Sequence, residues 1–284
     1  MKIGATLIPL VGWGVNREDG DAARELHLEA VRQLVEEWGL QAIELNGDFS
    51  VLYPQIFGIA YYEGVAELQE QLGFACTVHL PFLWLDGISL AEPVRRASVE
   101  CVSRSAELAK PLLVDSYVLH LWGIWSSLLL SVQDMPQDEK QSLLDMMLLA
   151  GHSTLEEVSA LVPSQQLCVE NLEHFPFESV AGLVERERAK VCLDVGHLVV
   201  SGGDPMEFVE TYWGMIGEIH MHDVLVDGAG RRGGRDHLAL GRGCVDYVRL
   251  LDRLEEGGFE GVVVLEVNTE KDLLDSLKQV RRWL

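Results

Sequence analysis

Short apolar runs that recur along the whole chain place the strongest limit on its fold. Each run has the length and the continuous apolar character of a strand that is buried on both faces of a parallel sheet. The eight runs are Ile3–Ile8, Ala42–Leu45, Ala75–His79, Tyr117–Leu121, Leu167–Glu170, Val191–Asp194, Ile216–His220 and Val262–Val267.

Amphipathic segments with a helical period lie between these runs. Examples are Asp21–Trp38, Glu63–Leu72, Ser89–Ala109, Gln137–Leu161, Pro205–Trp213, Val245–Glu256 and Lys271–Leu284. Alternation of strand and helix predicts an α/β fold in which helices cover a parallel sheet. Eight such units in 284 residues fit a closed (β/α)8 barrel, the TIM barrel, better than an open doubly wound sheet.

The sequence shows no internal boundary and no sign of membrane insertion. No linker, low-complexity tract or charge block divides it, so we expect residues 1–284 to form one domain. No apolar run approaches the length of about 18 residues that a membrane span needs. The segment Met1–Ile8 has one lysine before a short apolar run, but no clear cleavage site follows, and we expect it to be the first strand.

The cysteines and the net charge restrict compartment and partners. Five cysteines without a CxxC pair are typical of a reducing compartment, so we expect a cytoplasmic protein. The net charge of −23 would repel duplex DNA unless a local basic face compensated for it. We therefore expect neither a nucleic acid nor a membrane as partner, and favour a small molecule.

Metal-ligating side chains gather at the carboxyl ends of the predicted strands, which form the active face of such a barrel. In chain order they are His79, His120, Glu170 with Asn171, Asp194 with His197, His220 with His222 and Asp223, Asp236 with His237, and Glu266. Six of the nine histidines belong to this set, and only His27, His152 and His174 do not. Scattered structural histidines would not sort in this way.

Imidazole and carboxylate ligands together suit zinc, manganese, iron or cobalt better than calcium. The set is too large for one ion, so we predict two to three divalent metal ions per chain, with zinc or manganese favoured. Asp194 has a second interpretation, because an acid between a strand and a helix is also a common helix N-cap.

The segment that follows the seventh strand has two further features. Gly228–Gly233 matches GxGxxG, but no strand directly precedes it, which argues against a dinucleotide site. Arg231, Arg232 and Arg235, with Arg242, are candidates to bind a substrate phosphate beside the metals, or else belong to a solvated loop.

Tryptophans follow the first, third and fourth strands. Trp13, Trp84, Trp122 and Trp125 are expected either to line the cavity mouth, where Trp122 with His222 would contact substrate, or to pack at the barrel rim.

With these residues, the chain resembles the xylose-isomerase-like barrel superfamily, which includes endonuclease IV and sugar isomerases and epimerases. The resemblance covers essentially the whole chain, 1–284. It implies that Glu170, Asp194, His220 and Glu266 hold one metal, and that His79 and His120 hold a second one with Glu170 as a bridge. His197 and His237 match ligands of a third metal in endonuclease IV. That protein has Asp-x-His, whereas here Asp236 directly precedes His237.

The motifs are most similar to those of cobamide-remodelling phosphodiesterases. The similar segments are 77–81, 118–121, 167–172, 191–198, 234–238 and 265–267. This resemblance implies cleavage of a phosphoester in the nucleotide loop of a corrinoid.

Two functions stay open at this point. The first is a metal-dependent phosphodiesterase, a hydrolase acting on a small phosphorylated molecule, in which paired metals activate water. The second is a metal-dependent sugar or polyol isomerase or epimerase, in which one metal polarises a carbonyl and the catalytic residues Glu170 and Glu266 move a proton. Repair of abasic DNA conflicts with the charge, and a non-catalytic binding barrel conflicts with the intact ligand set.

Overall fold

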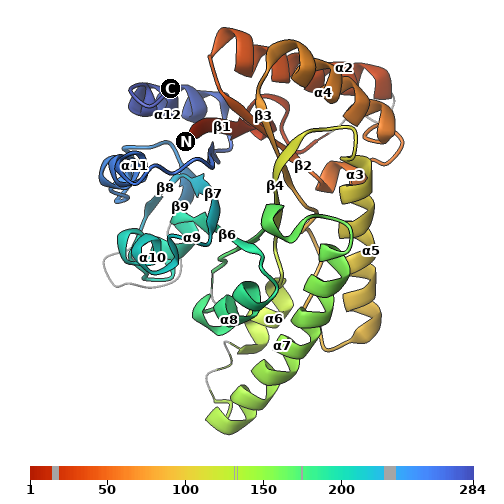
Figure 1. The fold of residues 1–284 in the computed structure, drawn as a ribbon, viewed down its shortest axis with the longest axis vertical. Helices are drawn as coiled ribbons and strands as arrows, with labels where there is room; N and C mark the ends of the chain where they lie inside the picture. The colour runs from red at the N-terminus through yellow and green to blue at the C-terminus, as the bar shows by residue number, and fades with distance from the viewer. Residues whose placement is uncertain (15–18, 131, 133, 174, 227–234) are drawn as a thin grey trace.

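The computed structural model of the chain is a closed barrel of parallel strands with helices around it (Figure 1). The structure describes residues 1–14, 19–130, 132, 134–173, 175–226 and 235–284. The barrel strands are β1 (Lys2–Thr6), β2 (Ala42–Asn46), β3 (Ala75–His79), β4 (Val114–Leu119), β5 (Leu167–Glu170), β6 (Lys190–Asp194), β7 (Ile216–Met221) and β10 (Val262–Leu265). They follow one another in chain order, and β10 closes the barrel on β1. The predicted (β/α)8 fold is confirmed.

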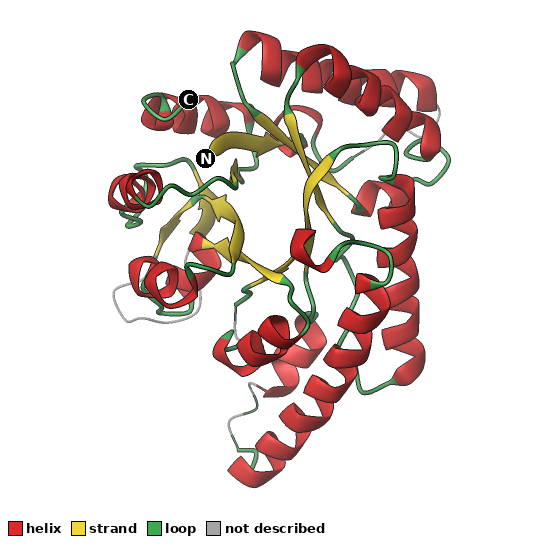
Figure 2. Cartoon of the chain, in the orientation of Figure 1, coloured by secondary structure: helices red, strands yellow, loops and turns green. Residues whose placement is uncertain are grey.

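Helices form an outer ring around the strands (Figure 2). They are α1 (Ile8–Val11), α2 (Gly20–Arg32), α3 (Asp48–Leu52), α4 (Ile59–Leu72), α5 (Glu92–Leu108), α6 (Ile124–Leu130), α7 (Gln137–Ser159), α8 (Glu178–Arg186), α9 (Val195–Val200), α10 (Pro205–Tyr212), α11 (Tyr247–Glu256) and α12 (Glu270–Val280). A π-helical turn, η1 (Gln33–Glu37), extends α2, and a 3₁₀ turn, η2 (Ser164–Gln166), precedes β5. Within the described ranges, no helix has both the length and the apolar character needed to cross a bilayer.

Side chains alternate between the two faces of each strand, as the pleat requires. Outward positions such as Ile43, Val169 and Ile219 are large, and they belong to the main core beneath the helices. Inward positions are small or polar: Val118, Cys168 and Cys192 form a cluster of their own. The barrel interior therefore has room for polar side chains, which lead up to the cavity described below.

A two-stranded antiparallel hairpin, β8 (Asp223–Leu225) with β9 (Arg235–Leu238), follows β7. It was not predicted, because both strands are short and one begins directly after the barrel strand. Asp223 anchors the segment that follows β9: its carboxylate accepts hydrogen bonds from the backbone N–H groups of Val224, Gly241, Gly243 and Val245 at 2.7–3.0 Å. Asp223 therefore has a structural role, although it lies among the strand-end acids.

Candidate metal centre

A cavity of about 660 Å³ opens at the carboxyl ends of the strands. Its floor is polar and includes Glu44, His79, His120, Glu170 and Glu266. Its outer wall is largely apolar and comes from the segments after β1, β3 and β4. Six of the predicted strand-end residues thus line one cavity, namely His79, His120, Glu170, His197, His237 and Glu266. Asp194 and His220 do not line the cavity themselves and lie buried beside this group.

Glu170 occupies the centre of the floor. Its Oε2 lies 2.9 Å from Nε2 of His120 and 3.3 Å from Nε2 of His79. Its Oε1 lies 3.4 Å from Nδ1 of His220. One buried carboxylate therefore faces two separate groups of imidazoles.

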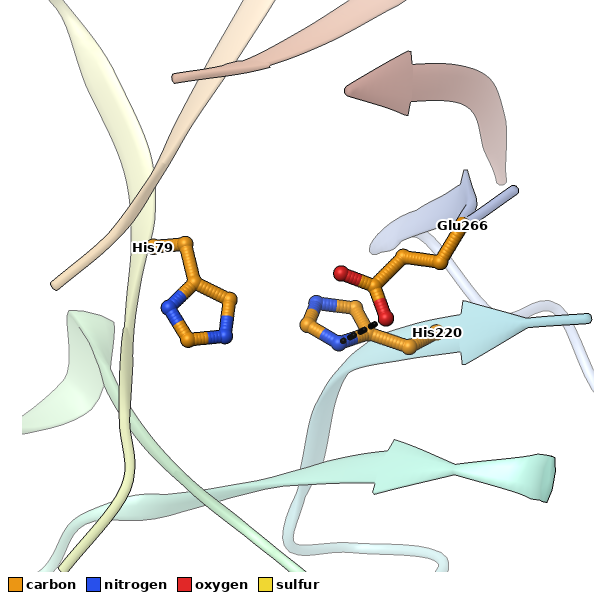
Figure 3. Close-up of side chains that lie close together, drawn as sticks. All are labelled: His79, His220 and Glu266. Carbon is orange, nitrogen blue, oxygen red and sulfur yellow. Dashed lines mark ion pairs between the residues drawn. The ribbon is translucent and has the colours of Figure 1, made fainter. Parts of the chain in front are cut away.

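A second group of potential ligands comprises Glu170, Asp194, His220 and Glu266, with one ligand atom of each within 4.8 Å of the others. Figure 3 shows His79 on one side of this space and His220 with Glu266 on the other, their polar atoms facing one another. The distance from His220 Nδ1 to Glu266 Oε2 is 3.4 Å. These are the residues that the sequence predicted for one metal.

Hydrogen bonds fix which nitrogen of each imidazole is available to a metal. The Nδ1–H of His79 donates to the Leu80 carbonyl at 2.9 Å, which leaves the Nε2 lone pair directed at Glu170. The Nε2–H of His220 donates to Glu44 at 3.2 Å, which leaves Nδ1. That Nδ1 is buried and makes no hydrogen bond to any described residue, although two carboxylates are close. A divalent cation fits this donor set.

Glu44 and Glu218 were missed by the sequence analysis. Both are buried inside the barrel; Glu44 belongs to the cavity floor, and Glu218 does not line the cavity. Glu218 accepts a hydrogen bond from the Ser116 hydroxyl at 2.5 Å, and its pKa is raised to about 8 by burial and by the neighbouring Glu44. The sequence feature that could have identified them is a carboxylate inside an apolar strand, where a charged side chain is rare unless it is paired.

Asp194 caps a helix and also lies in the candidate ligand group, so both interpretations of its sequence position remain compatible with the structure. It caps α9, because its Oδ1 accepts the His197 backbone N–H at 2.6 Å. Its own backbone is held by the side chain of Asn171, through two hydrogen bonds of 2.9 Å. Its carboxylate also belongs to the four-residue ligand group. The cap therefore orients a candidate ligand.

His222 is completely buried, which does not suit direct contact with a substrate. Its Nδ1 accepts the backbone N–H of His237 at 2.9 Å. The proton of the neutral ring is therefore on Nε2, which lies 3.2 Å from both carboxylate oxygens of Asp194 and donates to them. His222 thus links the β8–β9 hairpin to a predicted metal ligand.

The residues predicted for a third metal lie close together at the edge of the floor. The ring centroids of His197 and His237 are 5.9 Å apart. Nδ1 of His197 lies 3.4 Å from Glu173, which the sequence analysis also missed. Asp236 is about half exposed and lies against Nδ1 of His237 at 3.5 Å. Asp236, which directly precedes His237 in the sequence, therefore lies beside the imidazole ring of His237.

Opposite charges shift the acid–base properties of the floor. Burial alone would raise the pKa of Glu170, but His120 and His220 hold it well below its usual range. Burial would lower the pKa of His79, yet the hydrogen bond to Glu170 and the charge of Glu44 raise it to about 9. The floor therefore favours protonation of His79 and of His220, whose pKa is also raised, whereas burial lowers the pKa of His120.

Of the predicted phosphate-binding arginines, neither of the two that the structure describes, Arg235 and Arg242, lines the cavity. Arg231 and Arg232 lie outside the described residues, as does the Gly228–Gly233 motif. Arg235 is exposed on β9, and Arg242 forms ion pairs with Asp272 and Asp275. Among the described residues that line the cavity, none is lysine or arginine.

All four predicted tryptophans line the cavity. Trp84 and Trp125 are strongly exposed, and Trp13 is partly exposed. Trp122 is fully buried and stacks on Phe175 with 4.5 Å between ring centroids, so it supports the wall from behind.

The fold and the floor define a barrel protein with a candidate metal centre at its strand ends. The chain belongs to the xylose isomerase-like TIM barrel family, whose sequence profile matches residues 32–284. This confirms the predicted superfamily, whose members include isomerases, epimerases and endonucleases.

Two comparisons with curated proteins extend this result. The chain is 27% identical to an uncharacterized protein of Methanocaldococcus jannaschii over 77% of its own length and 73% of that protein. It is 26% identical to inosose dehydratase of Lacticaseibacillus casei, over only 31% of the chain and 33% of that protein.

Two solved structures share the fold over nearly their full length. A D-tagatose 3-epimerase-like protein superposes with a TM-score of 0.74 at 22% identity, covering 100% of this chain and 97% of the other. An AP endonuclease of family 2 from Brucella melitensis superposes with a TM-score of 0.68 at 18% identity, covering 99% and 98%. At these identities the likeness shows the fold.

Proposed function

We propose that the protein is a metal-dependent phosphodiesterase that acts on a small phosphorylated molecule. The observation that supports this best is the position of Glu170, whose two oxygens face different imidazole groups: His79 and His120 on one side and His220 on the other. A carboxylate in this position suits a pair of cations. The motif resemblance proposes a corrinoid with an intact nucleotide loop as the natural substrate to test.

Two divalent cations held side by side would lower the pKa of a water and stabilise the attacking and leaving oxygens of an in-line displacement. The residues of the chain supply the arrangement. His79 and His120 would hold one cation and Asp194 and His220 the other, with Glu170 between them. Glu266, which is only partly buried and lines the cavity, would accept the proton of the attacking water.

The charge of a phosphate would be neutralised by the cations themselves. None of the described lining residues is lysine or arginine, so within the described part of the chain the metal ligands would carry this function. Loss of one ligand should therefore affect hydrolysis much more than binding of the uncharged part of the substrate.

The test combines metal counting with a hydrolysis assay. Protein reconstituted with zinc or manganese should contain two to three ions per chain and should hydrolyse bis(4-nitrophenyl) phosphate. His79→Ala should lose at least one ion and nearly all activity while the circular dichroism spectrum stays the same. His152→Ala is the matched control, because His152 pairs with Glu187 away from the cavity. A single ion per chain, or full activity of His79→Ala, would contradict the proposal.

The second candidate function is a sugar or polyol isomerase or epimerase. The specific observation in its favour is that Glu170, Asp194, His220 and Glu266 alone form a complete ligand group, with two glutamates available to exchange a proton. It predicts one ion per chain and exchange of a carbon-bound hydrogen of a ketose such as D-tagatose in deuterated water. Such exchange, without phosphodiester hydrolysis, would establish this alternative.

A further inference from the structure

We propose that the outer half of the cavity is a stacking site for an uncharged, planar aromatic group of the substrate. This assignment rests on the proposed function in one respect: it takes the imidazole–carboxylate floor as the reacting end, so that the aromatic group lies at the other end. The substrate would therefore be a phosphoester that includes an aromatic ring system.

Exposed aromatic side chains at the mouth are the first observation. Trp84 is 77% exposed and Trp125 is 72% exposed, although both line the cavity. They come from neighbouring segments, after β3 and after β4. The backbone of Trp84 has φ 62°, in the left-handed region that is uncommon for residues other than glycine. Large apolar side chains held in water at a cavity mouth are typical of ligand sites.

Supporting rings continue this wall to the floor. Trp13 packs edge-on against Phe82, with ring centroids 6.3 Å apart. The ring centroid of Phe82 is 4.5 Å from that of His120 and 4.8 Å from that of His79. The aromatic surface therefore leads directly to two predicted metal ligands. A molecule whose phosphate binds at the floor would lie along this surface.

The distribution of polar groups argues for an aromatic ring in this position and against a second sugar. Most polar lining residues are at the floor, whereas the wall at the mouth includes Leu83, Trp84, Leu85, Ile124 and Trp125. A sugar ring would lose hydrogen bonds to water there without replacement. Flat rings, in contrast, stack favourably on tryptophan whatever their substituents. The cavity volume of about 660 Å³ is within the range of roughly 300–1,000 Å³ typical for drug-sized ligands.

The test uses two probes that share a ribose 5-phosphate part: adenosine 5′-monophosphate carries an aromatic base at C1, and ribose 5-phosphate carries a hydroxyl group there. Their binding to the metal-loaded protein is measured by isothermal titration calorimetry. We expect tighter binding of adenosine 5′-monophosphate. Trp84→Ala and Trp125→Ala should each weaken it by about 5- to 150-fold, the range for loss of one stacking contact. Ribose 5-phosphate should bind equally well to all variants.

Phenylalanine variants and a remote variant serve as controls. Trp84→Phe and Trp125→Phe should keep most of the affinity, because a flat ring remains. Leu113→Ala removes an equally exposed apolar side chain that precedes β4, at the opposite end of the barrel, and should change nothing. Equal binding of the two probes, or equal weakening of both by the alanine variants, would overturn the inference. A change in the molecular mass of Trp125→Ala in solution, without an effect on binding, would also overturn the inference, because Trp125 would then belong to a contact between subunits.

The outcomes also separate this inference from the proposed function. Hydrolysis of bis(4-nitrophenyl) phosphate together with equal binding of the two probes would refute the stacking site alone. A base-dependent, tryptophan-dependent affinity in a protein that hydrolyses no phosphodiester would refute the phosphodiesterase alone.

Discussion

Replacement of Gly196 by alanine tests the link between α9 and the metal centre. Gly196 lies in the first turn of α9, and a Cβ atom added there would come closer than 3.0 Å to the buried ring of His222. Real Cβ atoms essentially never approach so closely, so the ring would have to move. Movement would break its hydrogen bonds to the His237 backbone and to Asp194.

The expected loss of stability follows from these two contacts. A backbone N–H left without a partner costs about 1–3 kcal/mol, and a hydrogen bond to a charged group contributes about 1.5–3 kcal/mol. Gly196→Ala should therefore lower the free energy of unfolding by about 2.5–6 kcal/mol, a large part of the roughly 5–15 kcal/mol of an ordinary domain. Because Asp194 would lose the group that orients it, metal affinity should fall by about 10- to 100-fold.

Guanidinium denaturation of the metal-free protein and competition with a chromophoric chelator measure the two effects separately. Gly182→Ala is the matched control: Gly182 lies inside α8 with no atom within 4 Å of the added Cβ. That change should stabilise the protein by about 0.5–1 kcal/mol, the usual gain of alanine over glycine in a helix. If Gly196→Ala were as stable as the original protein and bound metal as tightly, the packing of His222 against Gly196 would not have the proposed role.

Three further perturbations have outcomes that the structure specifies. His27 is buried and its pKa is lowered to about 4. Only the unfolded chain then binds a proton between pH 6.5 and 4, so about 3 kcal/mol of stability is lost as the pH falls through that window. His27→Phe should remove this part of the loss in denaturation curves, and equal losses in both proteins would refute it. Glu44→Gln, which removes the charge beside His220 Nε2, should weaken metal binding by about 10- to 100-fold in chelator competition; unchanged affinity would refute an orienting role. Because the pKa of His79 is raised to about 9, a proton must leave before a cation binds, and metal affinity should rise by about tenfold per pH unit up to that pH. An affinity independent of pH would contradict this.

The fold and much of the floor were predictable because both depend on short-range patterns. Continuous apolar runs locate strands, and β3 and β5 begin and end at the predicted residues. Parallel strands bring their carboxyl ends to one edge, so the strand-end residues His79, Glu170 and Asp194 had to meet there. Strand boundaries were predicted less accurately where the apolar pattern was weaker: β4 starts at Val114, before the predicted Tyr117.

Orientation around the strand ends was not predictable. His222 and Asp223 directly follow a barrel strand, and nothing in the local sequence shows that they turn away from the cavity. The orientation of these two side chains depends on the pairing of β8 with β9. It also depends on Gly196, whose lack of a side chain leaves room for the ring of His222. Both contacts join residues that are far apart in the sequence, so they are tertiary effects, and tertiary context routinely overrides local preference.

Asp194 shows why a structural and a chemical interpretation of one residue need not compete. A carboxylate has four lone-pair sites, so acceptance of the His197 N–H and of the His222 Nε2–H still leaves capacity for a cation. The cap fixes the carboxylate at the strand end. Burial would raise its pKa, but the charge of His197 and the hydrogen bond from His222 hold the pKa of Asp194 below the usual range. The same bonds that start α9 therefore keep a predicted ligand ionised and oriented. A residue that ends a strand and caps a helix is for that reason a good place for a metal ligand, since the fold already supplies the rigidity that coordination needs.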